Sequence, residues 1–280
     1  MAEYMVFFRN DDVAMIEPGL KELTELFLER HLPITHAVEP ANLTPETARW
    51  LLTVAPHGVE IIQHGYSHAR HDKGEFGGNR SYANQLQDVS RGKRIMEDAF
   101  GSSFFPAFSF PYGAYNRHSM PVLAETSFKV VSSHVKFSTR RVTFDRLGRL
   151  LHRNVLWERG VSYHCRRRPQ GRLWDLSVCL SPIKQYLGGR GSSDCTLAQV
   201  EELKKEFMFC SQHTRAIGVV LHHRYHHSCE HSDLLTQFID WLVSFPRVRV
   251  VALRQIWTAL EQLDAAGYPN TNEEDEQPKN

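Results

Sequence analysis

Two aspartates and two histidines in this sequence are spaced so that together they could form a metal site. Asp11 and Asp12 close a short apolar run, and His64 and His68 directly follow another. Both runs are typical of buried strands, and in α/β proteins the carboxyl ends of parallel strands meet at one rim, where active sites collect. Asp12 and the two imidazoles would give a divalent ion such as zinc three protein ligands and leave one position open for water. The Asp11 carboxylate would then be free to take a proton from that water.

Each pair also has a simpler interpretation. Consecutive aspartates after a strand often cap a turn or a helix, because the carboxylate accepts hydrogen bonds from nearby backbone N–H groups. The chain contains 16 histidines, so two of them can lie four residues apart by chance. The order of the two pairs, each after its own predicted strand, favours the metal site.

Two further segments extend this pattern. Pro111-Tyr112-Gly113 comes shortly after the apolar run at 104–107, and His222 ends the apolar segment at 217–221. With these residues, the sequence resembles the polysaccharide deacetylase family (carbohydrate esterase family 4, NodB-like) over about residues 5 to 257. The resemblance implies an α/β fold, a distorted (β/α) barrel of about seven units.

The resemblance also implies a role for each matched residue. Asp11 would be the general base, and His222 would be the general acid that protonates the departing amine. The backbone N–H of Tyr112, next to Pro111, would stabilise the oxyanion. The metal ligands would be Asp12, His64 and His68. The implied cofactor is one divalent ion, with Zn²⁺ expected and Co²⁺ or Ni²⁺ as alternatives.

The sequence departs from the family pattern at two places. Ser109 stands where the family has an arginine that holds the base aspartate, so Asp11 is expected to be less firmly oriented. The family's Asp-x-x-Asp-Trp motif, whose aspartate tunes the acid histidine, has no clear match. Asp175, in Leu-Trp-Asp-Leu, is a candidate substitute. These departures point to a changed substrate or to reduced activity.

Composition restricts the class of protein. The 33 basic and 32 acidic residues of this 280-residue chain nearly cancel, which argues against a nucleic-acid-binding protein. No apolar stretch approaches the 18 residues of a membrane span, and no signal peptide is visible at the start. The five cysteines form no C-x-x-C pair and are typical of reduced thiols. We therefore expect a cytoplasmic protein whose partner is an N-acylated sugar or a nucleotide- or lipid-linked sugar precursor.

Predicted strands and helices alternate along the chain, as in a parallel sheet or a barrel. Residues 1–266 are expected to form a single catalytic domain, and the acidic, apolar-poor tail at 267–280 is expected to be disordered. A polar, glycine-bearing segment at 65–80 is expected to be a mobile loop beside the metal site. The expected strands are 5–9, 34–38, 59–63, 104–110, 129–133, 150–156, 173–180, 217–222 and 248–253. The expected helices are 19–31, one that begins at Thr44-Pro45, 84–100, one to about 212 that a capping box at Thr196 and Gln199 opens, 232–245 and one through 263.

Two clusters have alternative interpretations. Arg166-Arg167-Arg168 is interpreted as a solvated loop, with a grip on a substrate phosphate or carboxylate as the alternative. The histidines between 222 and 231, with Cys229, are interpreted as a polar loop after a strand, with a second metal site as the alternative.

Three functions fit these observations. The first is a metal-dependent hydrolase that removes an N-acyl group, acetyl above all, from an amino sugar or its precursor. The second is a non-catalytic carbohydrate-binding or scaffold protein on the same fold, which the two departures favour and the retained Asp11 disfavours. The third is a hydrolase of the same mechanism that acts on another amide or on a formyl group.

Overall fold

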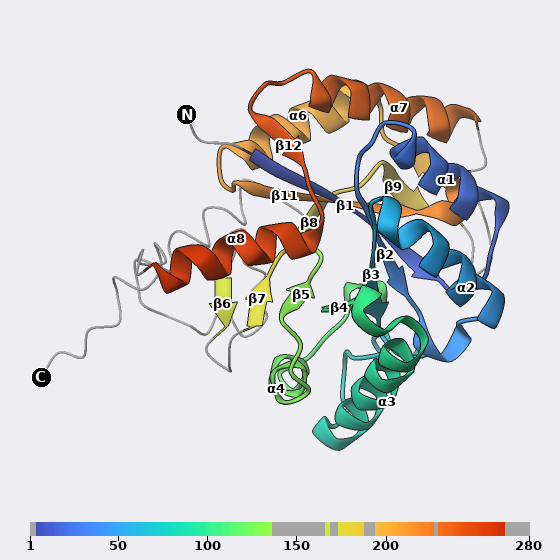
Figure 1. The fold of residues 1–280 in the computed structure, drawn as a ribbon, viewed down its shortest axis with the longest axis vertical. Coiled ribbons are helices and arrows are strands. Elements are labelled where there is room, and N and C mark those ends of the chain that lie inside the picture. Colours follow the sequence, from blue (N-terminus) through green and yellow to red (C-terminus); the bar gives the residue numbers. More distant parts are fainter. Residues whose placement is uncertain (1–3, 136–165, 169–172, 188–193, 227–228, 267–280) are drawn as a thin grey trace, which may run out of the picture.

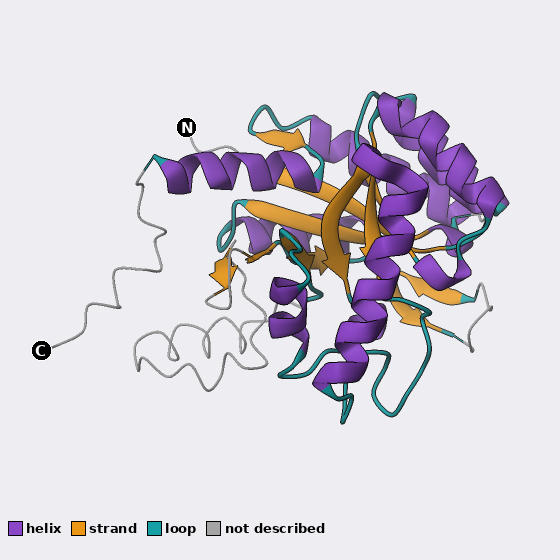
Figure 2. Cartoon of the chain, turned by 60° about the horizontal axis from the view of Figure 1, so that its bottom comes forward, coloured by secondary structure: helices purple, strands orange, loops and turns teal. Residues whose placement is uncertain are grey.

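The computed structural model describes residues 4–135, 166–168, 173–187, 194–226 and 229–266. A predominantly parallel sheet forms the centre, and helices cover it (Figures 1 and 2). In sheet order its strands are β6 (Arg166–Arg168), β7 (Leu173–Asp175), β5 (Val130–Ser132), β4 (Phe104–Ser109), β3 (Val59–His64), β2 (Ile34–Val38), β1 (Tyr4–Val13), β11 (Ala216–His222) and β8 (Val178–Leu180), and β12 (Val248–Val250) also pairs with β1. Of these, β6 alone runs antiparallel to its neighbour, and β9 (Ile183–Tyr186) and β10 (Cys195–Leu197) form a separate antiparallel pair.

The sheet curls until its two sides meet. The backbone N–H of Val135, just beyond β5, donates to the carbonyl of Val178 in β8 at 2.8 Å. The N–H of Val178 in turn donates to the carbonyl of Ser133, also at 2.8 Å. These bonds connect the segment after β5 to β8, which itself pairs with β11. The fold is therefore the expected α/β distorted barrel.

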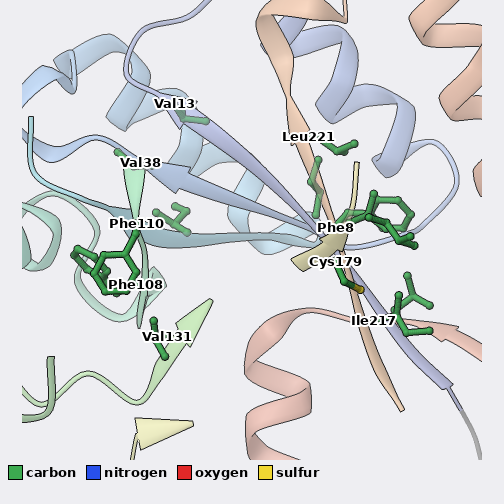
Figure 3. Packing of buried hydrophobic residues seen from close by; sticks show 14 of the residues in the cluster. Phe8, Val13, Val38, Phe108, Phe110, Val131, Cys179, Ile217 and Leu221 are labelled. Carbon is green, nitrogen blue, oxygen red and sulfur yellow. The ribbon is translucent and has the colours of Figure 1, made fainter. Parts of the chain in front are cut away.

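The helices and the strands share one apolar layer. The helices are α1 (Pro18–Leu28), α2 (Pro45–Val54), α3 (Tyr82–Phe100), α4 (Ser119–Glu125), α6 (Val200–Ser211), α7 (Cys229–Val243) and α8 (Leu253–Ala265). Figure 3 shows part of this layer, in which Phe8 of β1 lies with Ile217 and Leu221 of β11. Phe27 of α1 packs edge-on against Phe8, with ring centroids 4.9 Å apart. Burial of such side chains, about 1.5–3 kcal/mol each, fixes the helices on the outside of the sheet.

A second apolar cluster contains the alternate strand residues and one helix only. Phe7 lies next to Phe8 in β1 and points to the other face of the sheet. It clusters with Ile62 of β3 and with Leu253 and Ile256 of α8. Successive strand residues point to opposite faces, so this cluster fills the inside of the curl. Buried Glu60, near the start of β3, accepts hydrogen bonds from the backbone N–H groups of Leu253 and Arg254 at 3.0 and 2.9 Å. An acceptor there satisfies the first N–H groups of α8, which closes the end of the barrel opposite His64.

Most of the expected elements are present, with shifts that have physical reasons. The 34–38 strand and the Thr44-Pro45 helix start are confirmed, since the Thr44 hydroxyl accepts from the N–H of Thr47. The capping box opens α6 at Gln199 with Glu202, because Thr196 is committed to the β9–β10 pairing. The prediction of a loop at 166–168 is wrong, because these residues form β6.

Three other expectations have different outcomes. The strand expected at 173–180 is split into two. The first part, β7, pairs with β5, and the second part, β8, pairs with β11. The strand expected at 248–253 ends at Val250, because α8 begins at Leu253. The expected strand at 150–156 and the expected disordered tail at 267–280 lie outside the described residues. Among the helices that are described, none is long and apolar enough to cross a lipid bilayer.

The loop at 65–80, expected to be mobile, is anchored in the apolar layer. Phe76 is fully buried, and its ring packs edge-on against Phe108 and Phe110 with centroids 5.4 and 5.8 Å away. Beside it, the buried Glu75 carboxylate accepts hydrogen bonds from the backbone N–H groups of Tyr66 and Ser67. The segment that follows β3 is therefore held by packing and by hydrogen bonds.

We expect Phe76→Ala to lower the free energy of unfolding by about 3–5 kcal/mol, because it opens a cavity in the apolar layer. Urea denaturation followed by circular dichroism measures this change. Leu52→Ala, at a residue that is 40% exposed, is the matched control and should cost clearly less than Phe76→Ala. Equal losses in the two variants would mean that Phe76 does not anchor the loop.

Candidate metal centre and active site

A bulge in β1 brings two consecutive aspartates to the same end of the barrel. Between Asn10 and Val13 the register with β2 shifts, so that three steps along β1 match two along β2. Asp12 takes up the extra residue with a left-handed backbone, φ 65°. Without the bulge the side chains of Asp11 and Asp12 would point to opposite faces of the sheet. With it, both carboxylates reach the rim.

The carboxylate of Asp12 meets two imidazoles at this rim. Its Oδ1 lies 3.2 Å from Nε2 of His64 and 3.0 Å from Nε2 of His68. Four ligands around an ion at about 2.0–2.1 Å are separated from one another by about 3.3 Å, so these spacings are close to the edges of a tetrahedral zinc site. Within the part of the chain that the structure describes, this is the only group of three acidic, histidine or cysteine side chains that converges in this way.

Each imidazole is oriented by contacts outside the trio. Nδ1 of His64, at the end of β3, lies 2.7 Å from Oγ of Ser109, the residue beside it in β4. A hydrogen bond from Nδ1–H to that hydroxyl would leave Nε2 free to bind an ion. The ring of His68 packs on that of Tyr112 at 4.5 Å, and the Tyr112 hydroxyl donates to the His68 carbonyl at 3.0 Å. The three residues therefore fit a divalent ion in donor chemistry. Nδ1 of His64 has a hydrogen-bond partner, and Nδ1 of His68 is buried with none among the described residues.

Backbone strain is concentrated at the same place. Asp12, His68 and Tyr112 are three of the five described non-glycine residues with positive φ. Such conformations cost of order 1–3 kcal/mol each and persist where the surroundings enforce them, often at functional sites. Pro111 is buried and packs against Gly65, where an added Cβ would lie 2.4 Å from Cγ of the proline. Pro111 thus holds the backbone directly after His64.

Asp11 is held by an arginine from its own strand. Nε and Nη2 of Arg9 donate to Oδ1 and Oδ2 of Asp11, both at 2.7 Å, and Nη1 donates to the carbonyl of Ser132. Both residues are buried. Burial alone would raise the pKa of Asp11, but the charge and hydrogen bonds of Arg9 and the nearby His64 together lower it. Asp11 is therefore an oriented, ionised carboxylate.

His222 lies on the neighbouring strand at the same level. It is the register partner of Asp11 in the pairing of β1 with β11. Its Nδ1 lies 3.0 Å from the hydroxyl of Tyr186 in β9. Burial lowers the pKa of His222, although the charges of Asp12 and Asp11 act in the opposite direction. Asp175, the candidate tuning residue, bonds instead to the hydroxyls of Ser133 and Ser177 at 2.7 and 3.1 Å.

A buried polar chain behind the site was not found from the sequence. The amide of Asn10 joins Nδ1 of His36 at 3.1 Å, and its Oδ1 accepts from the backbone N–H of His223 at 2.8 Å. Nε2 of His36 lies 3.0 Å from the hydroxyl of Thr24 in α1. Burial lowers the pKa of His36 to about 3, so it is a neutral structural histidine. The chain fixes β1 just before Asp11 and β11 just after His222.

The histidine cluster between 222 and 231 brings two histidines together, but its described residues include no group of three that converges as metal ligands would. Nδ1 of His226 and Nδ1 of His231 lie 3.2 Å apart, and both residues are buried. Cys229 is exposed at the start of α7. Residues 227–228 lie outside the described part of the chain. Among the residues that are described, the arrangement does not meet the requirements of a closed zinc site.

Comparisons with known proteins agree with this geometry. The family model for polysaccharide deacetylase matches residues 5–131, which include Asp11, Asp12, His64, His68 and the Pro-Tyr-Gly segment. Over residues 5–131 the chain is similar to the polysaccharide deacetylase family. No curated protein matches the sequence.

Solved structures show the same fold at low identity. A Mycobacterium smegmatis protein classed with the polysaccharide deacetylases is 17% identical with a TM-score of 0.69, over 94% of this chain and 92% of that one. The Puue allantoinase is 10% identical with a TM-score of 0.64, over 92% and 90% of the two chains. A family 4 pseudoenzyme from Bacillus anthracis is 12% identical with a TM-score of 0.54, over 91% and 66%. Identities this low establish the shared fold only.

The arginine that holds Asp11 comes from the same strand in this chain. Ser109, at the position of the family's arginine, now contacts the metal-centre residue His64, and Arg9 binds Asp11. The expectation that Asp11 would be poorly held does not match this geometry, because Arg9 makes a two-point contact with it. The sequence does contain a signal for this contact. Arg9 stands two positions before Asp11, and strand residues i and i+2 share a face.

We expect the His64→Ala, His68→Ala double variant to lose its divalent ion while the barrel stays folded. Isothermal titration with Zn²⁺ measures binding, and circular dichroism checks the fold. Ser109→Ala should weaken binding about 10- to 100-fold, the usual effect of removing a partner of a histidine ligand. Ser132→Ala, at another buried serine, is the matched control. Full zinc binding by the double variant would exclude this centre.

We expect Arg9→Met to lower the free energy of unfolding by about 3–5 kcal/mol at neutral pH, because it leaves the Asp11 carboxylate buried and unpaired. The double variant Arg9→Met, Asp11→Asn should recover a large part of this loss, since no unpaired charge remains. Urea denaturation of the two single variants and the double variant measures the coupling. Purely additive losses would contradict the pairing.

Proposed function

We propose that this protein is a metal-dependent hydrolase that removes an N-acyl group, acetyl above all, from an amino sugar or a sugar precursor. The observation that carries the proposal is the Arg9–Asp11 pair beside the trio of Asp12, His64 and His68. A protein that only binds sugar through a metal ion would need no more than Asp12, His64 and His68. A second carboxylate that is buried, ionised and held at both oxygens supports a catalyst.

Each residue of the site would perform one task. A bound divalent ion would polarise the amide carbonyl and lower the pKa of water. Asp11 would accept the proton of the attacking water. The backbone N–H of Tyr112, in the strained turn after β4, would donate to the oxygen that becomes negatively charged. His222 would protonate the departing nitrogen.

Tyr186 supports the role of His222. Burial raises the pKa of the Tyr186 hydroxyl well above its usual value, so this hydroxyl keeps its proton. In protonated His222 both ring nitrogens carry a proton, so Nδ1–H would donate to the Tyr186 oxygen and the Nε2 proton would be directed away from Tyr186. A lowered pKa also makes protonated His222 a stronger acid, which suits transfer to an amine. Tyr186 would thus take the place of the missing tuning aspartate.

The compartment is part of the proposal. The described cysteines Cys179, Cys195, Cys210 and Cys229 are free thiols, which suits a reducing cytoplasm. There the substrate would be a soluble or lipid-linked precursor and not a finished wall polymer. Cell fractionation with an antibody to the native protein tests this location, and recovery outside the cell would contradict it.

The decisive experiment is a metal-reconstituted assay against free, nucleotide-linked and polymeric N-acyl sugars. Acetate and formate release are both measured. Two other amides test the alternative of a shared mechanism on another substrate: allantoin, followed by its ring opening to allantoate, and a simple N-acetyl amino acid, followed by acetate release. Sugar binding without hydrolysis of any substrate would support the scaffold alternative instead.

We expect Asp11→Asn and His222→Ala each to keep the metal and to lower kcat about 100-fold or more, the scale of lost general acid or base catalysis. Zinc content is measured by elemental analysis alongside the kinetics. The exposed Asp240→Asn and His57→Ala variants are the matched controls. Turnover by both site variants at the rate of the parent would show that the roles are wrongly assigned.

A further inference from the structure

Arg224 lies at the edge of the metal centre and has no role in the scheme above. It belongs to the short turn at His223–Tyr225, which directly follows His222 and β11. Its Nη2 is 3.8 Å from Oδ2 of Asp12, whose other oxygen faces the two imidazoles. The guanidinium therefore flanks the same carboxylate that would bind the ion.

The guanidinium is poorly satisfied by the protein. Charge-assisted hydrogen bonds are about 2.7–2.9 Å long, so a separation of 3.8 Å from Asp12 is a loose contact. Arg9, two strand positions from the same carboxylate pair, makes two bonds of 2.7 Å to Asp11. Nε of Arg224 is buried and finds no hydrogen-bond partner among the described residues. A buried N–H left in this state costs about 1–3 kcal/mol, so its retention calls for a compensating contact.

Charge balance for Asp12 does not account for Arg224. The two imidazoles already hold Asp12 at 3.0 and 3.2 Å, and a divalent ion bound there would neutralise its charge. Arg224 then contributes a surplus positive charge. Its side chain is 21% exposed, so part of it is accessible from the rim. A planar, forked cation of this kind matches a carboxylate or a phosphate.

We propose that Arg224 binds an oxyanion of the substrate, a carboxylate or a phosphate, that lies within a few bonds of the scissile amide. This inference rests on the proposed hydrolase function. The ion would hold the reacting carbonyl about 2 Å away, and Arg224 is separated from the ion only by the Asp12 carboxylate. The anionic group and the amide would therefore lie close together on the substrate. The substrate class is a compact anionic N-acyl compound, such as an N-acyl amino sugar 1-phosphate or an N-acyl compound with a neighbouring carboxylate.

Matched ligand pairs that differ in charge test this inference. N-acetylglucosamine 1-phosphate is compared with N-acetylglucosamine, and N-acetylglycine with its carboxamide. Calorimetric titration is done on the zinc-loaded Asp11→Asn protein, so that hydrolysis is slowed about 100-fold or more during the measurement. We expect the charged member of one pair to bind about 10- to 100-fold more tightly, the scale of hydrogen bonds to a charged group. The pair that shows this difference identifies phosphate or carboxylate as the source of the oxyanion.

The same titrations in an Asp11→Asn, Arg224→Gln background test the residue. We expect the preference for the charged ligand to disappear, while affinity for the neutral ligand and zinc content stay unchanged. Arg224→Lys should restore part of the preference, because charge remains without the fork. Arg91→Gln, an exposed arginine over the ring of Tyr66, is the matched control.

Two outcomes would overturn the inference: equal binding of both members in each pair, or a charge preference that survives Arg224→Gln. Because binding is measured separately from turnover, failure of the inference is distinct from failure of the proposed function. Charge-selective binding that depends on Arg224, in a protein that hydrolyses nothing, supports the inference and removes the proposed hydrolase. Hydrolysis of neutral N-acyl sugars with no charge preference supports the hydrolase and removes the inference.

Discussion

The arrangement of the residues at the rim of the barrel depends on the ion pair between Arg9 and Asp11. Two buried charges are tolerated only when their geometry and their remaining hydrogen bonds are nearly complete. Here both oxygens of Asp11 and three nitrogens of Arg9 are engaged, the third by the Ser132 carbonyl at the end of β5. The pair therefore ties β1 across the interior to β5, and the strands between them must curl to allow it. The same contact keeps Asp11 ionised and frees Asp12 for the two histidines.

The second constraint is the bulge at Asp12. A regular strand would present only one of two consecutive aspartates at the rim. The left-handed conformations of Asp12, His68 and Tyr112 are unfavourable for residues with a Cβ, and packing must hold them in place. That packing comes from the buried Phe76, from Glu75 and from Pro111 against Gly65. The apolar layer is thus what stabilises the strained positions.

The sequence predicted those features that depend on local pattern or on fixed spacing. The strands that carry Asp12, His64 and His222 follow from apolar runs, and the convergence of their ends follows from parallel pairing. The contacts of Arg9 with Asp11 and of Ser109 with His64 could not be predicted from that pattern alone, because they depend on which side chains share the interior of the barrel. Tyr186 was missed for a similar reason. It lies on β9, in the separate two-stranded sheet, and approaches His222 only through tertiary packing.

The short sequence separation of Arg9 and Asp11 has a consequence for folding. The partners are two residues apart, whereas an arginine at 109 would have to close a loop of roughly a hundred residues, at a higher entropic cost. An extended strand alone brings the two side chains to one face, so their approach does not wait for β4 to dock. Local opening of β4 would release Ser109 from His64 and leave the carboxylate of Asp11 paired. In this chain Asp11 and its anchor Arg9 form one contiguous unit of low contact order, and this unit is independent of the strand whose Ser109 contacts His64.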